Sequence, residues 1–388
     1  LALASGGVSS LLIDRGALAT FENPAFDGRA YAIAHSSGRM LEALGLWSAV
    51  AAHAEPILDI RISDGRAGEG AASFFLHFDH HEIDEGPMGH FLEDRFLRNA
   101  LLETVAAHPL VELLPETAVL AQEVHTSAVS VTLATGETRA GRLLVGCDGR
   151  GSEVARRAGI RRTEWAYAQT SLVAAIDHEK PHEGCAHQFF MPEGPLAILP
   201  LPGNRSSIVW TERAERAEAF AALGDDAYLK ALRPRFGAHL GEISLAGGRY
   251  TYPLGLSLAQ SLVAPRVALT GDAAHGIHPL AGQGLNLGLR DVAALSEVMI
   301  EARRRGEDIG SADVLERYRR WRGFDIAALA AATDGINRIF SNDNPLLRLG
   351  RDLALGAINR APLLRRRLIR EAAGLTGDLP RLLQGRAI

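Results

Sequence analysis

The chain has 388 residues, of which 47% are hydrophobic and 22% charged, so it has the composition of a globular protein with room for two or three lobes. Its formal net charge of −5 argues against a nucleic-acid partner, because nucleic acids are bound by basic surfaces. Cys147 and Cys185 are far apart, so we expect no disulfide framework, no CxxC metal site and a reducing, cytoplasmic environment. No apolar run of about 18 residues predicts a membrane-spanning helix.

The beginning of the chain predicts the tail of a helix, a glycine turn and a buried strand over 8–13 that ends at Asp14. An acid at the end of the second strand of a dinucleotide-binding fold accepts hydrogen bonds from the adenosine ribose. As a single feature, Asp14 is equally typical of a turn. Such a fold needs a central strand and a GxGxxG loop just upstream, so we expect the chain as given to be truncated or renumbered.

The next stretch holds a loop with Arg29, an amphipathic helix over 36–46 and an alternating strand over 57–63. Arg29 is suited to a pyrophosphate clamp and is equally typical of a solvated loop. Asp64-Gly65 predicts a hairpin turn. The histidines that follow (His77, His80 and His81) have no matching distant ligand, so we predict no metal site.

A helix is expected over 92–107, followed by strands over 111–124 and 129–133 with a hairpin turn after the second. The interval 167–252 is rich in strand-forming segments separated by turn residues. Because it lies between two pieces that resemble nucleotide-binding elements, it predicts an inserted antiparallel sheet.

Two apolar strands end in a carboxylate just before a helix. Residues 142–145 lead to Asp148-Gly149, and residues 267–270 lead to Gly271-Asp272. After the second strand, Gly282 and Gly284 open a helix whose first N–H groups have no partner within the helix. Ligands of open α/β sheets lie beyond the carboxyl ends of strands, so the two strand ends together predict a shared polar cofactor.

The chain after Asp291 is helical, with one or two helices over 312–340. Residues 345–370 carry seven arginines between leucines and isoleucines at helical spacing. Such a basic amphipathic segment fits a peripheral contact with an anionic membrane surface and fits an ordinary solvated helix equally well.

Four features follow one another along the chain: Asp14, DGRAYA at 27–32, CDGRGS at 147–152 and GDAAHGIHPLAGQGLNLGLRD at 271–291. In this order they resemble the FAD-dependent aromatic hydroxylases, of which para-hydroxybenzoate hydroxylase is the best-known type. Within that superfamily the chain is most similar to the UbiH-like hydroxylases of ubiquinone biosynthesis. The resemblance extends over essentially the whole chain. It rests also on GPLAILPL at 194–201, SSIVW at 206–210, YPL at 252–254 and FSNDNP near 340–345.

The resemblance implies a role for each matching residue. Asp272 would bind the ribityl chain of FAD, and Pro279 would lie beside the isoalloxazine ring. The loop Gly282, Gly284, Leu285 and Asn286 would direct main-chain N–H groups at the flavin N1–O2 edge. Asp14 would hold the adenosine ribose, Arg29 would meet the pyrophosphate, and Asp148 and Gly149 would shape both the FAD and the NAD(P)H sites. No catalytic base is evident; the candidates are His187, Tyr167 and His278.

The implied fold is α/β: a Rossmann-like FAD-binding domain, an inserted antiparallel sheet that binds substrate, and a C-terminal helical region. The expected boundaries are 1–60, 91–160 and 257–320 for the FAD-binding domain, 61–90 and 161–256 for the substrate domain, and 321–388 for the helical region.

The implied activity is hydroxylation of the ring of a polyprenylated phenol, with NADH or NADPH reducing FAD, O2 as co-substrate and a flavin C4a-hydroperoxide as oxidant. The implied location is the cytoplasm or the inner membrane surface, with a biosynthetic complex as a further partner. A halogenase or isoprenoid reductase of the same fold, and a non-catalytic scaffold subunit, are the alternatives.

Overall fold

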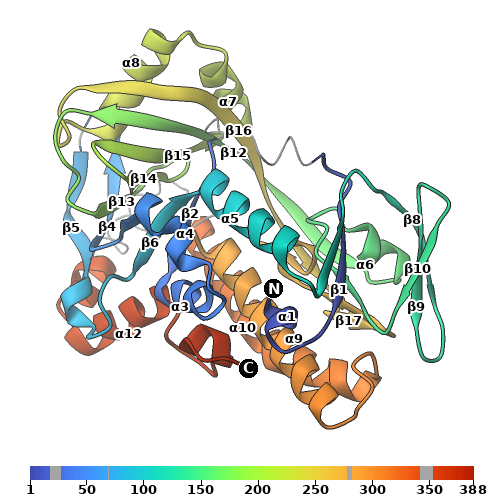
Figure 1. Cartoon of the computed structure of the whole chain (residues 1–388). Helices are drawn as coiled ribbons and strands as arrows, with labels where there is room; N and C mark the ends of the chain where they lie inside the picture. Colours follow the sequence, from blue (N-terminus) through green and yellow to red (C-terminus); the bar gives the residue numbers. More distant parts are fainter. Residues whose placement is uncertain (18–27, 69, 278–281, 341–352) are drawn as a thin grey trace.

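The computed structural model describes residues 1–17, 28–68, 70–277, 282–340 and 353–388. Its architecture is α/β, with one large mixed sheet and a set of smaller sheets and helices beside it (Figure 1). The chain begins with α1 (Ala2–Ser5), which Gly6 ends as predicted, and β1 (Ser10–Ile13) follows. Strand β1 pairs in parallel with β7 (Val111–Leu114).

The predicted strand over 111–124 is two strands. Pro115 cannot donate to a ladder, and Glu116 adopts a left-handed φ of 51°, so the chain turns after β7. The second half is β8 (Val119–Val124), which joins β9 (Val129–Leu133) and β10 (Thr138–Gly141) in an antiparallel three-stranded sheet. The interpretation of 111–124 as one strand was therefore wrong.

The large sheet has the order β19-β16-β12-β15-β14-β13-β4-β5. Its strands are β4 (Asp59–Arg66), β5 (Gly70–Asp79), β12 (Arg162–His178), β13 (Cys185–Phe190), β14 (Leu196–Leu201), β15 (Arg205–Arg213), β16 (Ile243–Ala259) and β19 (His275–Gly276). All of its pairs are antiparallel except β13 with β4, so the expected antiparallel sheet is a mixed one.

The expected hairpin turn at Asp64-Gly65 was wrong. Asp64 is buried and lies within β4, and the ladder to β5 continues past a bulge to Arg66. The chain turns at Ala67 and Gly68 instead, where Gly68 takes a φ of 86°.

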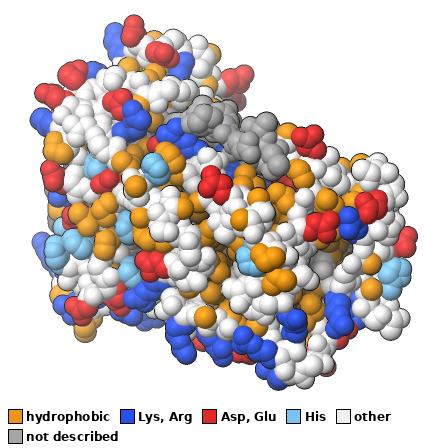
Figure 2. Space-filling model, viewed as in Figure 1, with side chains coloured by type: hydrophobic (Ala, Val, Ile, Leu, Met, Phe, Trp, Pro, Cys, Tyr) orange, Lys and Arg blue, Asp and Glu red, His pale blue; other side chains and the backbone are white. Residues whose placement is uncertain are grey.

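Helices α7 (Ala214–Ala221) and α8 (Asp225–Phe236), which the sequence interpretation missed, cover one face of the large sheet. Trp210 on β15 and Tyr228 on α8 are central to the core there. The other face meets β2 (Ala30–Ala34), β3 (Ala54–Pro56) and β6 (Gly89–Glu93), which form a small antiparallel sheet. On the flank formed by β4, β5 and β13, histidine side chains gather at the surface (Figure 2).

The remaining helices pack around the smaller sheets, except the last of them, which packs against β5 of the large sheet. They are α3 (His35–Ala43), α4 (Trp47–Val50), α5 (Asp94–Ala107), α6 (Glu153–Arg157), α9 (Gln283–Arg304), α10 (Ala312–Phe340) and α12 (Pro362–Ala372), with 3-10 turns η1 (Ala51–His53), η2 (His80–Glu82), η3 (Gly271–Ala273) and η5 (Arg381–Gln384). No helix in the described part of the chain is long and apolar enough to cross a membrane.

Candidate cofactor-binding and active site

The two carboxylate-tipped strands are neighbours. Strand β11 (Leu144–Gly146) pairs in parallel with β18 (Val267–Leu269), which also pairs with β17 (Val263–Ala264). Because parallel strands end at the same edge, Asp148 and Asp272 leave the sheet side by side. Arg150 links the two loops, since its Nε donates to Oδ2 of Asp272 at 3.3 Å. The two strand ends that predicted a shared cofactor site therefore lie at the same edge of one sheet.

The turn that carries Asp272 is held through main-chain atoms, so the carboxylate of Asp272 is left exposed. Arg162, which is mostly buried, donates to the carbonyl oxygens of Asp272 and Ala273. The side chain of Asp272 is half exposed. Helix α9 approaches closely at Gly288, where a Cβ would lie 3.2 Å from the Cα of Gly271. The geometry presents a fixed carboxylate to a ligand at the strand end.

The start of α9 is suited to a group with partial negative charge. Its N-cap, Gly282, has a left-handed φ of 63°, and no side-chain hydrogen bond from Gly282 caps the helix. A Cβ on Gly282 would lie 2.9 Å from the Cβ of Ala32, whereas a Cβ on Gly284 would meet no described atom within 4 Å. The first-turn amides carry the positive end of a long helix dipole. Together with Asp272, this cradle fits a polar cofactor such as FAD.

Asn286 is engaged within the protein. Its Nδ2 donates to the carbonyl oxygens of Ala32 (2.8 Å) and Gly282 (3.2 Å). Its Oδ1 accepts from the amide of Ala34 and the hydroxyl of Ser37, at 2.9 and 2.8 Å. The side chain clasps the helix start to β2 and α3, so only its main chain is left to meet a ligand.

Asp148 is likewise committed to local structure. Its carboxylate accepts from the hydroxyl of Ser152 and from the amides of Glu153 (2.8 Å) and Val154 (3.1 Å), which are orphan donors at the start of α6. Gly149 beside it has a left-handed φ of 81°, and a Cβ there would meet no described atom within 4 Å. This loop therefore offers a ligand its open backbone rather than its acid.

Asp14 and Arg29 lie at the ends of different strands. Asp14 follows β1, is exposed, and accepts the amide of Gly16 at 2.7 Å, an ordinary turn bond. Arg29, partly exposed, forms an ion pair of 3.0 Å with Asp94 at the start of α5. Asp94 also binds Arg98 and accepts the Tyr31 hydroxyl at 2.9 Å. Sequence reasoning gave Asp94 no role, and the structure makes it the anchor of this arginine.

The two candidate bases that the structure describes, Tyr167 and His187, do not come together. Tyr167 lies in a bulge of β12 and donates to Asp334 of α10 at 3.1 Å. The ring of His187 lies against Phe189 and His239 on the sheet face covered by α8, away from the face that meets β2 and β6. His278 lies outside the described residues, as does Pro279.

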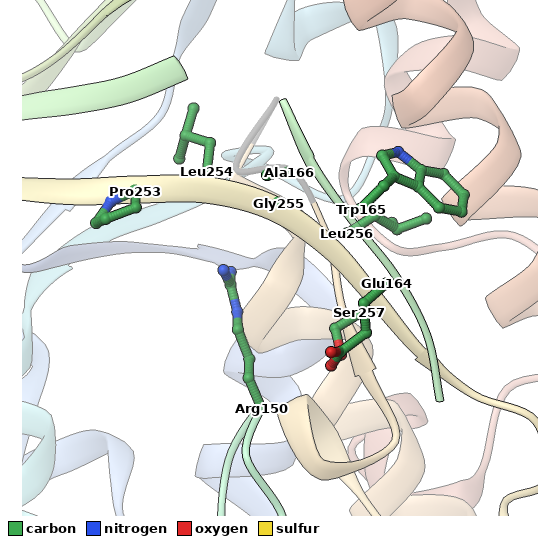
Figure 3. Close-up of a pocket in the computed structure, with 9 residues that line it drawn as sticks. All are labelled: Arg150, Glu164, Trp165, Ala166, Pro253, Leu254, Gly255, Leu256 and Ser257. Carbon is green, nitrogen blue, oxygen red and sulfur yellow. The ribbon is translucent and has the colours of Figure 1, made fainter. Parts of the chain in front are cut away.

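A pocket of about 370 Å³ opens beside the Arg150–Asp272 pair, where β12 and β16 pair with each other beyond the end of β15. Figure 3 shows Arg150, Glu164 and Ser257 on one side of the strands, with the Trp165 indole turned to the other. Ser257 donates to Glu164 at 2.5 Å and accepts from Arg162 at 2.9 Å. The other lining residues are Trp165 and Ala166 of β12 and residues 253–256 of β16.

The histidines with apparent metal spacing are used in local structure. Ligand atoms of Asp79, His80 and His81 lie within 4.8 Å of one another. Asp79, however, caps η2 by accepting the amide of His81 at 2.9 Å. His77 stands apart and bonds Asp59.

Sequence reasoning also missed the residues that hold the site from behind, namely Arg162, Asp291 and Arg322. Arg162 belongs to β12 and reaches the turn of Asp272, 110 residues away. Asp291 and Arg322 are fully buried and bonded to each other. Asp291 ends the glycine-rich motif, so its presence there was the one local signal available.

Comparisons with known proteins agree with this geometry. A family described as "FAD binding domain" matches residues 1–330. The chain is 43% identical to the ubiquinone hydroxylase UbiL of Rhodospirillum rubrum, over 99% of this chain and 89% of that protein. It is 34% identical to the 3-demethoxyubiquinol 3-hydroxylase of Escherichia coli, over 97% and 95%. The crystal structure of p-nitrophenol 4-monooxygenase from Pseudomonas putida matches with a TM-score of 0.78 at 18% identity, over 97% and 94%, which shows the shared fold.

The fold and the matching FAD-binding domain show that this protein is a flavoprotein with the architecture of the aromatic hydroxylases. The chain belongs to the family of the UbiH-like FAD-dependent hydroxylases, as the resemblance of its motifs predicted.

Proposed function

We propose that this protein hydroxylates the aromatic ring of a prenylated phenol in ubiquinone biosynthesis, with FAD as cofactor, NADH or NADPH as reductant and O2 as co-substrate. The observation that carries the proposal is the half-exposed carboxylate of Asp272 at the tip of β18, beside the glycine start of α9. The names of the relatives supply the substrate class, since both are hydroxylases of ubiquinone or its precursors.

Within this proposal each residue has a separate task. Asp272 accepts hydrogen bonds from the ribityl hydroxyls, and the first-turn amides of α9, at Gly284 and Leu285, face the flavin ring. Asp14 holds the adenosine ribose through the carboxylate oxygen that does not bind Gly16. Arg29, with its charge partly balanced by Asp94, meets the pyrophosphate. The open backbone at Gly149 lies where cofactor and reductant approach.

Bound FAD supplies the activation of O2 and the transfer of one oxygen atom. The chain supplies the surroundings. The positive end of the α9 dipole would stabilise negative charge on the reduced ring. The phenol must also lose its proton; Tyr167 and His278 remain candidates for this step, and the position of His187 on the α8 side of the sheet argues against His187.

The proposal is tested by adding FAD to the purified protein and recording the visible spectrum after gel filtration. A retained flavin spectrum is expected, with a strong loss of retention in Asp272→Asn. A protein that stays colourless at saturating FAD would overturn the proposal. A second assay then distinguishes a hydroxylase from a reductase of the same fold. For a hydroxylase, adding a prenylated phenol stimulates the oxidation of NAD(P)H and yields a hydroxylated product.

We further propose a peripheral membrane contact through α12 and the helical turn over 353–359. Leu353 and Leu363 are 55% and 85% exposed, and Leu364 is 44% exposed. Arginines on the inner side of α12 are paired: Arg365 with Glu82 and Arg370 with Glu85.

The arginines beside the exposed leucines (Arg360, Arg366 and Arg367) have no ion pair with any residue that the structure describes. An apolar tip surrounded by unpaired cations suits an anionic bilayer and an oily substrate, and the same face is available to a biosynthetic complex.

Flotation with vesicles that contain an anionic phospholipid tests the membrane contact. We expect the wild-type protein to float and Leu363→Ser with Arg367→Glu to stay in solution. The control is Leu120→Ser, which removes another exposed leucine (60% exposed) from β8, far from α12 in the chain. Wild-type protein that stays wholly in solution would contradict the contact.

A further inference from the structure

A buried carboxylate lies directly behind the proposed flavin site. Asp291, on the third turn of α9, has no exposed surface. Three donors from three elements converge on it: the Nε of Arg322 at 2.8 Å, the Nε2 of His275 at 2.5 Å, and the amide of Gly271 at 3.1 Å. An ionised carboxylate is stable in the interior only when its lone pairs are satisfied in this way.

The third of these bonds determines what the network does. Gly271 precedes Asp272 and starts the turn η3, and its φ of 59° places its amide toward α9 rather than along β18. The two other fixed points of the turn are the Arg162 bonds to the carbonyl oxygens of Asp272 and Ala273. Asp291 therefore fixes the first residue of the turn, and Arg162 fixes the two residues that follow it.

Helix α10 takes part through two side chains. Arg322 binds Asp291 and also donates to Asp325 at 2.6 Å. One turn earlier, the hydroxyl of Tyr318 donates to the carbonyl oxygen of Leu269, the last residue of β18, at 2.8 Å. Burial raises the pKa of Tyr318 well above its usual range, so the hydroxyl keeps its proton and remains a donor. The strand end and the turn are thus both tied to α10.

We propose that Asp291 is a positioning residue for the flavin: it holds the Gly271-Asp272 turn at the place where the Asp272 carboxylate meets the ribityl chain, and Arg322 holds Asp291. The inference rests on the proposed FAD site and adds to it a residue that does not touch the cofactor. It makes the affinity for FAD depend on α10, a helix that follows the described glycine cradle in the chain.

The test is a thermodynamic cycle of FAD binding. The dissociation constant is measured by flavin fluorescence for the wild-type protein, Asp291→Asn, Asp272→Asn and the double variant. An acceptor amide keeps one bond but loses the charge that Arg322 requires, so Asp291→Asn is expected to weaken FAD binding at least tenfold. In the Asp272→Asn background the same change is expected to cost less than threefold, because Asp291 acts through Asp272.

Two further variants separate positioning from loss of stability. Glu212→Gln is the matched control: Glu212 is equally buried and paired with Arg235, but on the sheet face covered by α7 and α8. It should lower the melting temperature without changing FAD affinity. Arg322→Lys, which keeps the charge, should retain more FAD affinity than Arg322→Gln, and covers the case in which Asp291→Asn fails to fold.

Any of three results would overturn the inference. The FAD affinity of Asp291→Asn could be unchanged, the losses of FAD affinity from the two single variants could multiply in the double variant, or Glu212→Gln could weaken FAD binding as much as Asp291→Asn does. If Asp291→Asn does not fold, equal FAD affinity in Arg322→Lys and Arg322→Gln would overturn it. These results leave the proposed function intact, because they require that the wild-type protein binds FAD. A wild-type protein that does not bind FAD would overturn both the proposed function and this inference.

Discussion

His187 makes the stability of this protein depend on pH. The ring lies on β13 with its centroid 4.6 Å from that of His239 and 5.6 Å from that of Phe189. Burial, followed by the repulsion of His239 and Arg61, lowers the pKa of His187 from 6.5 to about 3. A proton on this ring would place a cation among other positive groups and apolar side chains, so the folded protein keeps the ring neutral.

The sign follows from proton binding. Between pH 6.5 and about pH 3 the unfolded chain holds a proton on His187 and the folded protein does not. The contribution of the neutral His187 ring to the free energy of unfolding is therefore fully present above pH 6.5. It is lost progressively as the pH falls toward the pKa of His187 in the folded protein. One pKa unit corresponds to about 1.4 kcal/mol, so lowering the pH from 7 to 5 should remove about 2 kcal/mol through His187 alone.

Urea unfolding of the wild-type protein and of His187→Gln at pH 7 and pH 5 measures this contribution. The variant cannot titrate at this position, so its free energy of unfolding should fall by about 2 kcal/mol less than that of the wild-type protein. His125→Gln is the control, because His125 is exposed. An identical pH dependence in the wild-type protein and His187→Gln would refute the reasoning.

Two further predictions concern the cofactor loops. Gly282→Ala, which places a Cβ 2.9 Å from that of Ala32 in a left-handed backbone, should destabilise the apoprotein by about 1–2 kcal/mol. Gly284→Ala, inside the first turn of α9, should not lower the melting temperature of the apoprotein and should weaken only FAD binding. Asp148→Ala should destabilise the apoprotein by about 1–2 kcal/mol through loss of the α6 cap, measured by urea unfolding; an unchanged midpoint would show that the cap is replaced by water.

Local chemistry predicts some elements and fails at others for identifiable reasons. The strand, glycine cradle and helix from Val267 to Arg304 were predictable, because an apolar run, a turn and a 3.6-residue repeat follow each other without interruption. Helices α7 and α8 were missed, although their alanines and charged residues favour helix, because the surrounding strands dominated the interpretation of the whole interval. The parallel pairing of β13 with β4 has no local signal, since it joins segments more than one hundred residues apart.

The site shows a different limit. Motif order placed Asp148, Asp272 and Asn286 together, and the sheet edge at β11 and β18 does bring the first two side by side. The motifs do not reveal which polar side chains remain available to a ligand, because that depends on partners elsewhere in the chain. The acceptors of Asp148 are taken by α6, and the amide of Asn286 is taken by β2 and α3.

Asp272 differs from these two because its surroundings are bonded through other atoms. Arg162 binds its main chain and Asp291 binds the preceding amide, so the turn is rigid while the carboxylate is left half exposed beside Arg150. A ligand that binds there gains a fixed acceptor without having to order it, which is the physical content of preorganisation. The residues that create this condition lie 19 and 110 positions away from Asp272. Asp291 ends the same glycine-rich motif, but the motif does not show which atom Asp291 binds, and Arg162 lies outside every motif that the sequence offers.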